Sequence, residues 1–218
     1  PMIVTASRGL LLQQWQLEID ETTGNGNSPK AAPVVRCVRS IRGHSEPMLD
    51  MEFDSTGTFV ATGSADRSAR VWDMRGGFAT HNFRGHSGIV NMVRFHPDPI
   101  KLLLVTGSED CSARVWSLNE KTCLATLGCH MSAITSVAFT LDGLTMATGS
   151  RDKVVNFWDI NNNYTLMKTF PVYEDVEGLC IVSDLEQPAE SSIDAERGTK
   201  RKRTLDTGTQ TSAQGYLA

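Results

Sequence analysis

The sequence lacks the features that mark a membrane protein or a generally basic, nucleic-acid-binding chain. No stretch of 18 consecutive apolar residues occurs, so no membrane-spanning helix is expected. The 218 residues carry 21 Lys and Arg against 25 Asp and Glu, so no overall positive field attracts nucleic acid, although a local patch could still do so. With 40% apolar and 21% charged residues, the composition is that of an ordinary globular chain and excludes a disordered or collagen-like one.

Cysteine is also too sparse and too irregular for a framework role. The five cysteines form an odd set without any Cys-x-x-Cys pair, which argues against disulfide scaffolds and zinc ribbons. Cys129-His130 is the one tempting metal pair, but a zinc site needs further ligands, so no metal is expected. Small buried thiols in a reducing compartment are the preferred interpretation. Gly24-Asn-Gly26 precedes no helical pattern and is no phosphate loop, so no cofactor is expected.

What the chain does contain is an internal repeat. His44, His86 and His130 are spaced by 42 and 44 residues. A Thr-Gly-Ser-x-Asp segment and a tryptophan follow each histidine, and each Trp lies six residues after its Asp. Several residue types kept in phase over three copies indicate a repeat architecture.

Each copy has the pattern of short strands. In the first copy, Met48–Phe53 alternates apolar and polar residues, as a half-buried strand does, and Asp54–Gly57 has turn composition. No segment shows a sustained helical period, so the fold class is all-β. The predicted strands are 48–53, 59–62, 68–72 and 80–83; 89–95, 102–106, 112–116 and 123–127; and 134–139, 145–148, 154–158 and 166–170.

A period in the low forties with Gly-His and Trp-Asp marks resembles the WD-repeat family. That resemblance implies β-propeller blades, three complete and two partial, that belong to a larger propeller. The expected division is 1–42 as the second half of a blade with a polar loop, 43–84, 85–128 and 129–171 as blades, 172–183 as the first strand of a further blade, 184–214 as a disordered insertion, and 215–218 as the start of the next strand. The chain is therefore expected to be a fragment.

The resemblance also implies that each blade contains a hydrogen-bonded tetrad of His, Ser or Thr, Asp and Trp. A buried Asp needs donors and an indole N–H needs an acceptor, and the other members supply them. A Thr-His-Asp set also invites a catalytic interpretation, but three copies at one period favour a structural role, so no catalytic residue is expected. The expected structural tetrads are His44, Thr62, Asp66 and Trp72; His86, Thr106, Asp110 and Trp116; and His130, Thr148, Asp152 and Trp158.

The partial blades are marked by isolated strand patterns. Thr5 lies ten residues before Trp15, the same interval as Thr62 to Trp72, and 34–41 would be the outer strand of that blade. At the other end, Asp175–Val182 is expected to form the first strand of the next blade.

A basic run lies in the expected insertion. Lys200, Arg201, Lys202 and Arg203 are contiguous within a polar segment that has too few apolar residues to fold. Nuclear targeting is the preferred interpretation, and contact with RNA or a merely solvating charge cluster are the alternatives.

Three stretches resemble one branch of the family more closely, namely the nucleolar transducin β-like subunits of the UTP-B module of the small-subunit processome. These stretches are 4–15, 83–104 and 168–177. The resemblance implies a non-enzymatic scaffold for pre-rRNA processing in the nucleolus. It would work in a complex with other WD-repeat proteins, with possible contact to pre-rRNA or small nucleolar RNA. The candidate interaction residues are Arg67, Arg84, Arg151 and Lys153.

Two other functional classes remain open. A generic interaction scaffold, such as a substrate receptor of a ubiquitin ligase or a signalling adaptor, would share every blade feature. A propeller enzyme is the third class, and the sequence shows no constellation of residues that favours it.

Overall fold

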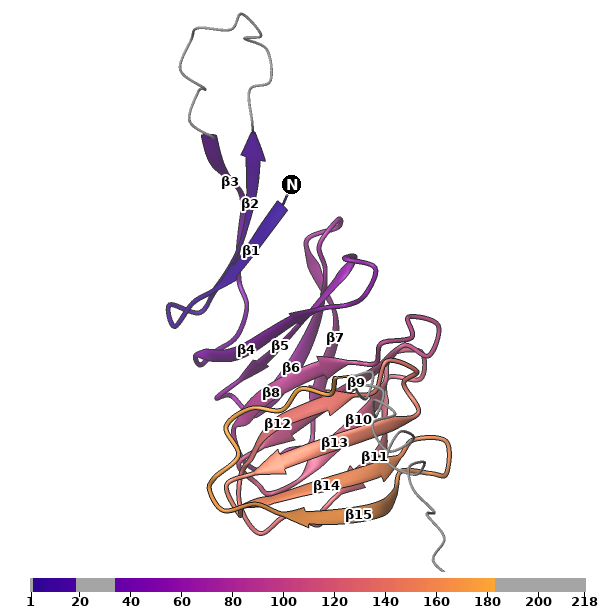
Figure 1. Ribbon diagram of the computed structural model, residues 1–218. Coiled ribbons are helices and arrows are strands. Elements are labelled where there is room, and N and C mark those ends of the chain that lie inside the picture. The colour runs from indigo at the N-terminus through magenta and orange to yellow at the C-terminus, as the bar shows by residue number, and fades with distance from the viewer. Residues whose placement is uncertain (1, 19–33, 183–218) are drawn as a thin grey trace, which may run out of the picture. The chain divides into compact units, whose positions relative to one another are not determined.

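The computed structural model describes residues 2–18 and 34–182, and within them every regular element is a β-strand (Figure 1). The strands are β1 (Met2–Ala6), β2 (Leu11–Glu18), β3 (Val34–Arg42), β4 (Met48–Phe53), β5 (Phe59–Ser64), β6 (Ser68–Asp73), β7 (Phe78–Arg84), β8 (Val90–Phe95), β9 (Leu103–Ser108), β10 (Ala113–Ser117), β11 (Thr122–Leu127), β12 (Ile134–Phe139), β13 (Thr145–Ser150), β14 (Val154–Asp159) and β15 (Thr165–Pro171). The predicted all-β class is confirmed. In this part of the chain no helix is long and apolar enough to cross a membrane.

The strands form four antiparallel sheets in which sequence neighbours pair. β1–β3 make a three-stranded sheet, here called the N-terminal sheet. β4–β7, β8–β11 and β12–β15 make three four-stranded sheets, here called the first, second and third blades. These blades lie within the predicted ranges 43–84, 85–128 and 129–171, and the exact division of the chain into domains stays a prediction.

The hairpin between the second and third strands of each blade has one repeated turn. The residue after the tetrad aspartate takes a positive φ: 67° at Arg67, 65° at Cys111 and 66° at Lys153. In the N-terminal sheet Leu10 takes the same place, with a φ of 68°. A three-residue hairpin loop needs a left-handed residue at this position, and a side chain there is strained. The turn places each tetrad aspartate within hydrogen-bond distance of the histidine of its blade.

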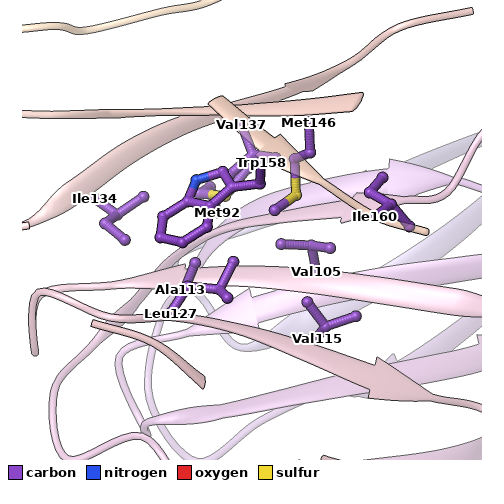
Figure 2. Close-up of a cluster of buried hydrophobic side chains, with 10 residues drawn as sticks. All are labelled: Met92, Val105, Ala113, Val115, Leu127, Ile134, Val137, Met146, Trp158 and Ile160. Carbon is purple, nitrogen blue, oxygen red and sulfur yellow. The ribbon is translucent and has the colours of Figure 1, made fainter. Parts of the chain in front are cut away.

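The hydrophobic core consists of clusters between neighbouring sheets. Val4 and Leu12 of the N-terminal sheet pack with Val60 and Trp72 of the first blade. A second cluster joins the first and second blades, and a third joins the second and third blades (Figure 2). The ten buried residues of that last cluster are Met92, Val105, Ala113, Val115, Leu127, Ile134, Val137, Met146, Trp158 and Ile160. Each blade therefore depends on its neighbour for burial, as expected of a repeat protein.

The glycine of each Thr-Gly-Ser segment lies where the next blade comes closest. An added Cβ on Gly63 would lie 3.0 Å from Val90 Cγ1, and one on Gly107 would lie 2.7 Å from Ile134 Cγ2. One on Gly149 would lie 2.5 Å from Val176 Cγ1. The absent side chain lets the first strand of one blade pack on the second strand of the blade before it.

The predicted strand over Asp175–Val182 is wrong in this structure, which contains no strand after Pro171 among the described residues. The segment nevertheless makes the contacts of a first strand. Val176 N–H donates to Ser150 O, Leu179 N–H donates to Ser136 Oγ at 2.8 Å, and Val176 lies buried against Ala147 and Val155. A strand needs a partner to complete its ladder of hydrogen bonds, and no described residue pairs with this segment.

The expectation of buried thiols is also wrong. Cys37, Cys123, Cys129 and Cys180 are exposed and Cys111 is half-buried. Cys37 and Cys123 lie on β3 and β11, the outermost strands of their sheets, where most side chains face solvent. The polar loop 19–33, the predicted insertion 184–214 with Lys200–Arg203, and the predicted strand 215–218 lie outside the described residues.

Candidate functional site: three buried hydrogen-bond networks

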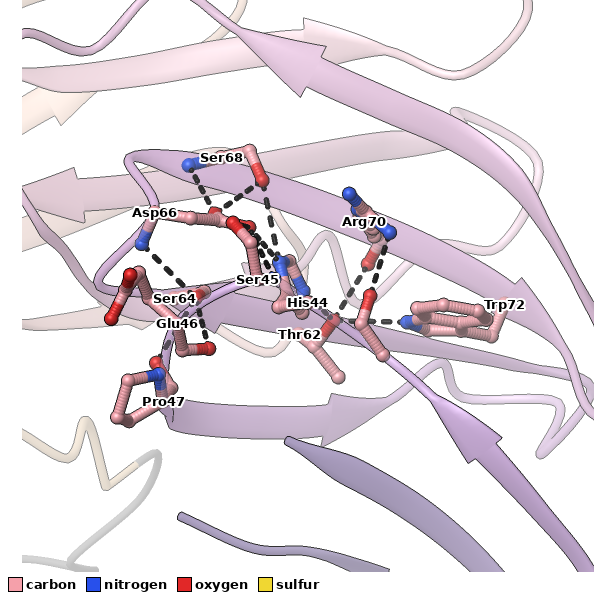
Figure 3. Close-up of polar contacts among 11 residues, drawn as sticks. His44, Ser45, Glu46, Pro47, Thr62, Ser64, Asp66, Ser68, Arg70 and Trp72 are labelled. Atoms are coloured by element: carbon pink, nitrogen blue, oxygen red, sulfur yellow. Dashed lines mark hydrogen bonds and ion pairs between the residues drawn. The ribbon is translucent and has the colours of Figure 1, made fainter. Parts of the chain in front are cut away.

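The tetrad of the first blade forms one continuous chain of hydrogen bonds (Figure 3). The Trp72 indole N–H donates to Thr62 Oγ1 at 2.9 Å, and Thr62 Oγ1 lies 2.8 Å from Nε2 of His44. His44 Nδ1 lies 2.9 Å from Asp66 Oδ2. The four residues come from the turn before β4, from β5, from the β5–β6 turn and from β6.

The donors and acceptors in this chain leave one arrangement of protons. An indole N–H only donates, so Thr62 accepts from Trp72. Its single hydroxyl proton goes to His44 Nε2 at 2.8 Å, which is closer than the other acceptor, Arg70 O, at 3.5 Å. Nε2 is then an acceptor, and the ring proton lies on Nδ1. An ionised carboxylate only accepts, so the Nδ1–H of His44 donates to Asp66. The neutral Nδ1–H tautomer satisfies every member.

The surroundings shift both pKa values in the direction that this arrangement needs. Burial lowers the pKa of His44 below 6.5, although the neighbouring Asp66 opposes this shift. Burial raises the pKa of Asp66, but hydrogen bonds from Ser68 and His44 outweigh burial and bring that pKa down to about 2. Near neutral pH the pair is therefore a neutral imidazole and a carboxylate.

The second blade repeats the same geometry. Trp116 donates to Thr106 at 2.9 Å, and Thr106 Oγ1 lies 2.7 Å from His86 Nε2. His86 Nδ1 lies 2.9 Å from Asp110 Oδ2. Burial lowers the pKa of His86, while the hydroxyl of Ser112 and the His86 ring outweigh burial and lower the pKa of Asp110.

The third blade keeps the four members and changes their surroundings. Trp158 donates to Thr148 at 2.9 Å, and His130 lies 2.8 Å from Thr148 and 3.0 Å from Asp152. Val154 stands where the first two blades have Ser68 and Ser112, so Asp152 receives the Val154 N–H at 3.1 Å and no hydroxyl from that position. Burial raises the pKa of Asp152, but the Met131 N–H and His130 outweigh it and lower that pKa.

The structure thus brings all twelve predicted tetrad residues together in their expected groups of four. It also forms a Trp–Thr pair in the N-terminal sheet, where Trp15 Nε1 donates to Thr5 Oγ1 at 2.9 Å, as their interval predicts. Both ring nitrogens of His130 are engaged within its tetrad, so the ring has no free nitrogen for the metal pair considered with Cys129.

A Thr–His–Asp relay with these distances has the connectivity of a nucleophile, base and orienting acid. Its chemistry is blocked by burial. Thr62, Thr106 and Thr148 are each 0% exposed, and each threonine oxygen also accepts an indole N–H. A substrate carbonyl cannot reach an oxygen that is enclosed in this way, so the geometry holds the blade together and offers no accessible nucleophile.

Asp50 and Glu52 of β4 have hydrogen-bond partners in the next blade. Asp50 Oδ2 accepts from Val93 N–H at 2.9 Å and from Arg94 Nη1 at 2.7 Å. Glu52 Oε2 accepts from Phe95 N–H at 2.5 Å. β4 thereby holds β8 through side chains, a contact between blades that spacing within one repeat cannot reveal.

His96 is a second residue that sequence reasoning missed. Its side chain is buried, its Nδ1 accepts from Asp98 N–H at 3.0 Å and its Nε2 lies 2.9 Å from Gly143 O. An added Cβ on Gly143 would lie 2.4 Å from the His96 ring, and Gly143 has a φ of 65°. The β8–β9 loop is thereby joined to the β12–β13 loop. The motif Phe95-His-Pro-Asp can be seen in the sequence, but the sequence does not reveal that His96 contacts Gly143.

The four candidate interaction residues are all exposed and lie at the tetrad turns or at the end of β7. The structure brings Arg67 and Arg84 to one pocket of about 290 Å³. Arg151 and Lys153 lie together on the β13–β14 turn. Within the described ranges 2–18 and 34–182, no group of three or more His, Cys, Asp or Glu residues is placed to hold a metal ion.

Comparison with known proteins adds a family signature. The model of the WD domain, G-beta repeat, matches residues 35–73, 77–117 and 121–159. Each match begins on or near the outer strand of one sheet and ends near the Trp of the next tetrad.

Individual relatives extend the similarity. Transducin beta-like protein 3 of Rattus norvegicus is 43% identical over 188 residues, which cover 86% of this chain and 21% of that protein. U3 small nucleolar RNA-associated protein 13 of Saccharomyces cerevisiae is 35% identical over 159 residues, 68% of this chain and 19% of the relative. The DENN domain and WD repeat-containing protein SCD1 of Arabidopsis thaliana is 33% identical over 123 residues, which cover 56% of this chain and 10% of that protein. The chain spans about a fifth of the length of the first two relatives.

Proposed function

The chain belongs to the WD40-repeat family, and we propose that it is part of a non-enzymatic scaffold in a nucleolar pre-ribosomal complex, the small-subunit processome. The observation that carries this proposal is the 43% identity to transducin beta-like protein 3 over 86% of the chain. The yeast relative, named for its association with U3 small nucleolar RNA, supports the same role. The scaffold would support pre-rRNA processing and assembly of the small ribosomal subunit.

The structure supports a scaffold rather than a catalyst. The polar side chains with the geometry of a reactive relay are enclosed, and their hydrogen bonds connect the turns of each blade to its own strands. Packed blades of this kind hold their turns in fixed positions, and fixed turns provide a surface on which other proteins assemble. The proposed partners are other WD-repeat proteins, with contact to pre-rRNA or small nucleolar RNA as a further possibility.

The basic run Lys200–Arg203 supports a nuclear location by its charge alone, since these residues lie outside the described part of the chain. Replacing all four residues with alanine in the full-length protein should slow nuclear entry and leave the melting temperature unchanged. Other subunits can carry the protein in as a complex, so slower entry, measured by live imaging, is the expected result.

The proposal is tested by depleting the full-length protein and measuring both ribosomal RNAs. Loss of small-subunit rRNA with normal large-subunit rRNA is the expected result, together with pre-ribosomal proteins in an affinity eluate. An unchanged small subunit, with cullin-adaptor or signalling proteins in the eluate, would favour the alternative, a generic WD-repeat interaction scaffold such as a ubiquitin-ligase substrate receptor or signalling adaptor. The similarity to SCD1 of Arabidopsis thaliana is the observation that keeps this alternative open.

A further inference from the structure

A polar pocket of about 290 Å³ lies where the first blade meets the second, next to the tetrad turns. Its lining residues are Ser45, Asp66, Arg67, Arg84, Gly85 and His86. Arg67 precedes Ser68, and Ser68 lies opposite Arg84 in the β6–β7 register, so the two arginines come from adjacent strand ends. The two guanidinium groups therefore line one pocket.

Neither guanidinium has a partner in the described part of the protein. Arg67 and Arg84 are exposed, and the ion pairs and side-chain hydrogen bonds within residues 2–18 and 34–182 do not include them. The one carboxylate in the pocket, Asp66, is already committed, because its Oδ2 accepts from His44 Nδ1 and from the Ser45 amide and hydroxyl (Figure 3). The Asp66 carboxylate offsets one of the two arginine charges, so the pocket keeps a net positive charge.

The fold itself does not require this pair of arginines. In the second blade the equivalent positions are Cys111 and Gly128, since Ala113 lies opposite Leu127 as Ala69 lies opposite Phe83. The corresponding pairs are Leu10 with Arg42 in the N-terminal sheet and Lys153 with Pro171 in the third blade. Among the four described sheets, only the first blade places two positive charges there. Since the turn forms equally well with Cys111, structural need does not explain Arg67.

We propose that this pocket binds an acidic side chain of a protein partner, a glutamate, aspartate or phosphorylated residue, between the guanidinium groups of Arg67 and Arg84. Guanidinium groups bind carboxylate and phosphate through paired hydrogen bonds. A pocket of this size holds one or two side chains. The inference goes beyond the processome proposal and does not depend on it.

An extended RNA backbone fits the pocket less well than an acidic peptide. RNA affinity grows with the number of phosphates that a protein neutralises, and two arginines beside the Asp66 carboxylate neutralise few. The chain as a whole carries a net charge of −4, which adds no general attraction for a polyanion.

The test measures binding of three fluorescein-labelled probes to the full-length protein by fluorescence anisotropy. The probes are a ten-residue peptide of alternating Glu and Ser, the same peptide with Gln for Glu, and a ten-nucleotide oligo(U). A fourth probe carries phosphoserine at the central serine, which distinguishes phosphate from carboxylate as the preferred group. The expected result is saturable binding of an acidic peptide, at least tenfold tighter than binding of the Gln peptide.

The variants are chosen to leave the fold intact. Arg67→Asn suits a residue with a φ of 67°, because Asn tolerates the left-handed region, and Arg84→Ala removes an exposed side chain. Each change should weaken acidic-peptide binding about tenfold, and Arg84→Lys should restore it only in part because Lys lacks the paired donors. The matched control is Arg42→Ala, an exposed arginine at the position of the N-terminal sheet that corresponds to Arg84.

Unchanged melting temperatures make the comparison valid. Equal loss of binding in Arg42→Ala, equal affinity for the Gln peptide, or no saturable peptide binding would each overturn the proposal. Tighter binding of oligo(U) that is lost with Arg67 and Arg84 would assign the pocket to RNA and overturn it as well. None of these outcomes bears on ribosomal RNA levels after depletion, so this proposal and the processome proposal fail separately.

Discussion

The first and third blades hold the same four tetrad residues and surround them differently. In the first blade the Ser68 hydroxyl donates to Asp66 at 2.5 Å, whereas Val154 occupies that place in the third blade. Opposite the tetrad threonine the first blade has Arg70 and the third has Asn156, whose Nδ2 lies 3.3 Å from His130 Nε2. The relay from indole to carboxylate is thus the constant part, and the donors around it are interchangeable.

Acidification should have the largest effect, because it acts on all three tetrads at once. His44 and His86 have folded pKa values below 6.5, so the unfolded chain binds their protons first. The stability they contribute is complete above about pH 6.5 and is lost as the pH falls below it. Asp66 contributes stability above pH 3.8, which is lost as the pH falls towards its folded pKa of about 2.

The free energy of unfolding should therefore decline in two steps on the acid side, measured by urea denaturation at a series of pH values. Carboxyl NMR titration sharpens the comparison. Asp152, which receives no hydroxyl from position 154, should take up its proton at a higher pH than Asp66 and Asp110. Simultaneous titration of all three would mean that the serine hydroxyls add nothing.

Removing a tetrad carboxylate should have the next largest effect. Asp110→Ala leaves the His86 ring, the Ser87 and Ser112 amides and the Ser112 hydroxyl without their acceptor. We expect a loss of about 2–4 kcal/mol in chemical denaturation. Asp152→Ala should cost less, because its carboxylate receives fewer donors. The neighbouring exposed Glu109→Ala serves as control and should change little.

A methyl group between blades should cost slightly less. In Gly107→Ala the new Cβ meets Ile134 Cγ2 at 2.7 Å and Met92 Cγ at 2.9 Å, both in strands that cannot easily move. Overpacking of this kind costs about 1–3 kcal/mol, measured by thermal or urea unfolding. Gly128→Ala, where nothing lies within 4 Å of the new Cβ, is the matched control. Equal loss in both variants would argue against close approach as the reason for Gly107.

Exchanging the hydroxyl between blades should give the smallest effect. Ser112→Ala removes a 2.6 Å hydrogen bond to Asp110 and should cost about 0.5–1.5 kcal/mol. The reverse exchange, Val154→Ser, should lower the pKa of Asp152 further, which NMR titration measures. A Val154→Ser protein whose Asp152 titrates as before would show that the two turns differ in more than this one side chain.

Much of the fold could be predicted because the informative residues are separated by fixed intervals within one repeat. The repeated pattern predicts the strand order, and the resemblance to the WD-repeat family implies the hydrogen bonds of His44, Thr62, Asp66 and Trp72, which stay within one blade. Contacts between blades follow no such interval rule. The roles of Asp50 and of the glycine in each Thr-Gly-Ser segment appear only when neighbouring blades are packed together.

The wrong predictions have separate origins. Asp175–Val182 has the sequence of a first strand and the contacts of one, but strand structure also requires pairing, which depends on residues elsewhere. Cys37 and Cys123 are exposed because their strands are outermost. The sequence pattern already predicts 34–41 as an outer strand, so the expectation of buried thiols rested on the general tendency of cysteine and not on strand position. Arg67 lies on the β5–β6 turn and Arg84 at the end of β7, and the spacing of residues in the sequence does not reveal that they line one pocket.

The one-way proton arrangement in each tetrad gives every blade its own spectroscopic reporter. In His44, His86 and His130 the Nδ1 proton lies between the ring nitrogen and a carboxylate oxygen, and these two atoms are 2.9–3.0 Å apart. All three histidine side chains are at most 2% exposed. Protons held in this way resonate far downfield and exchange slowly with water. Asp110→Ala and Asp152→Ala would identify the signals of the second and third blades, and the remaining signal would belong to the first. The three signals would then follow the opening of each blade separately when a partner binds.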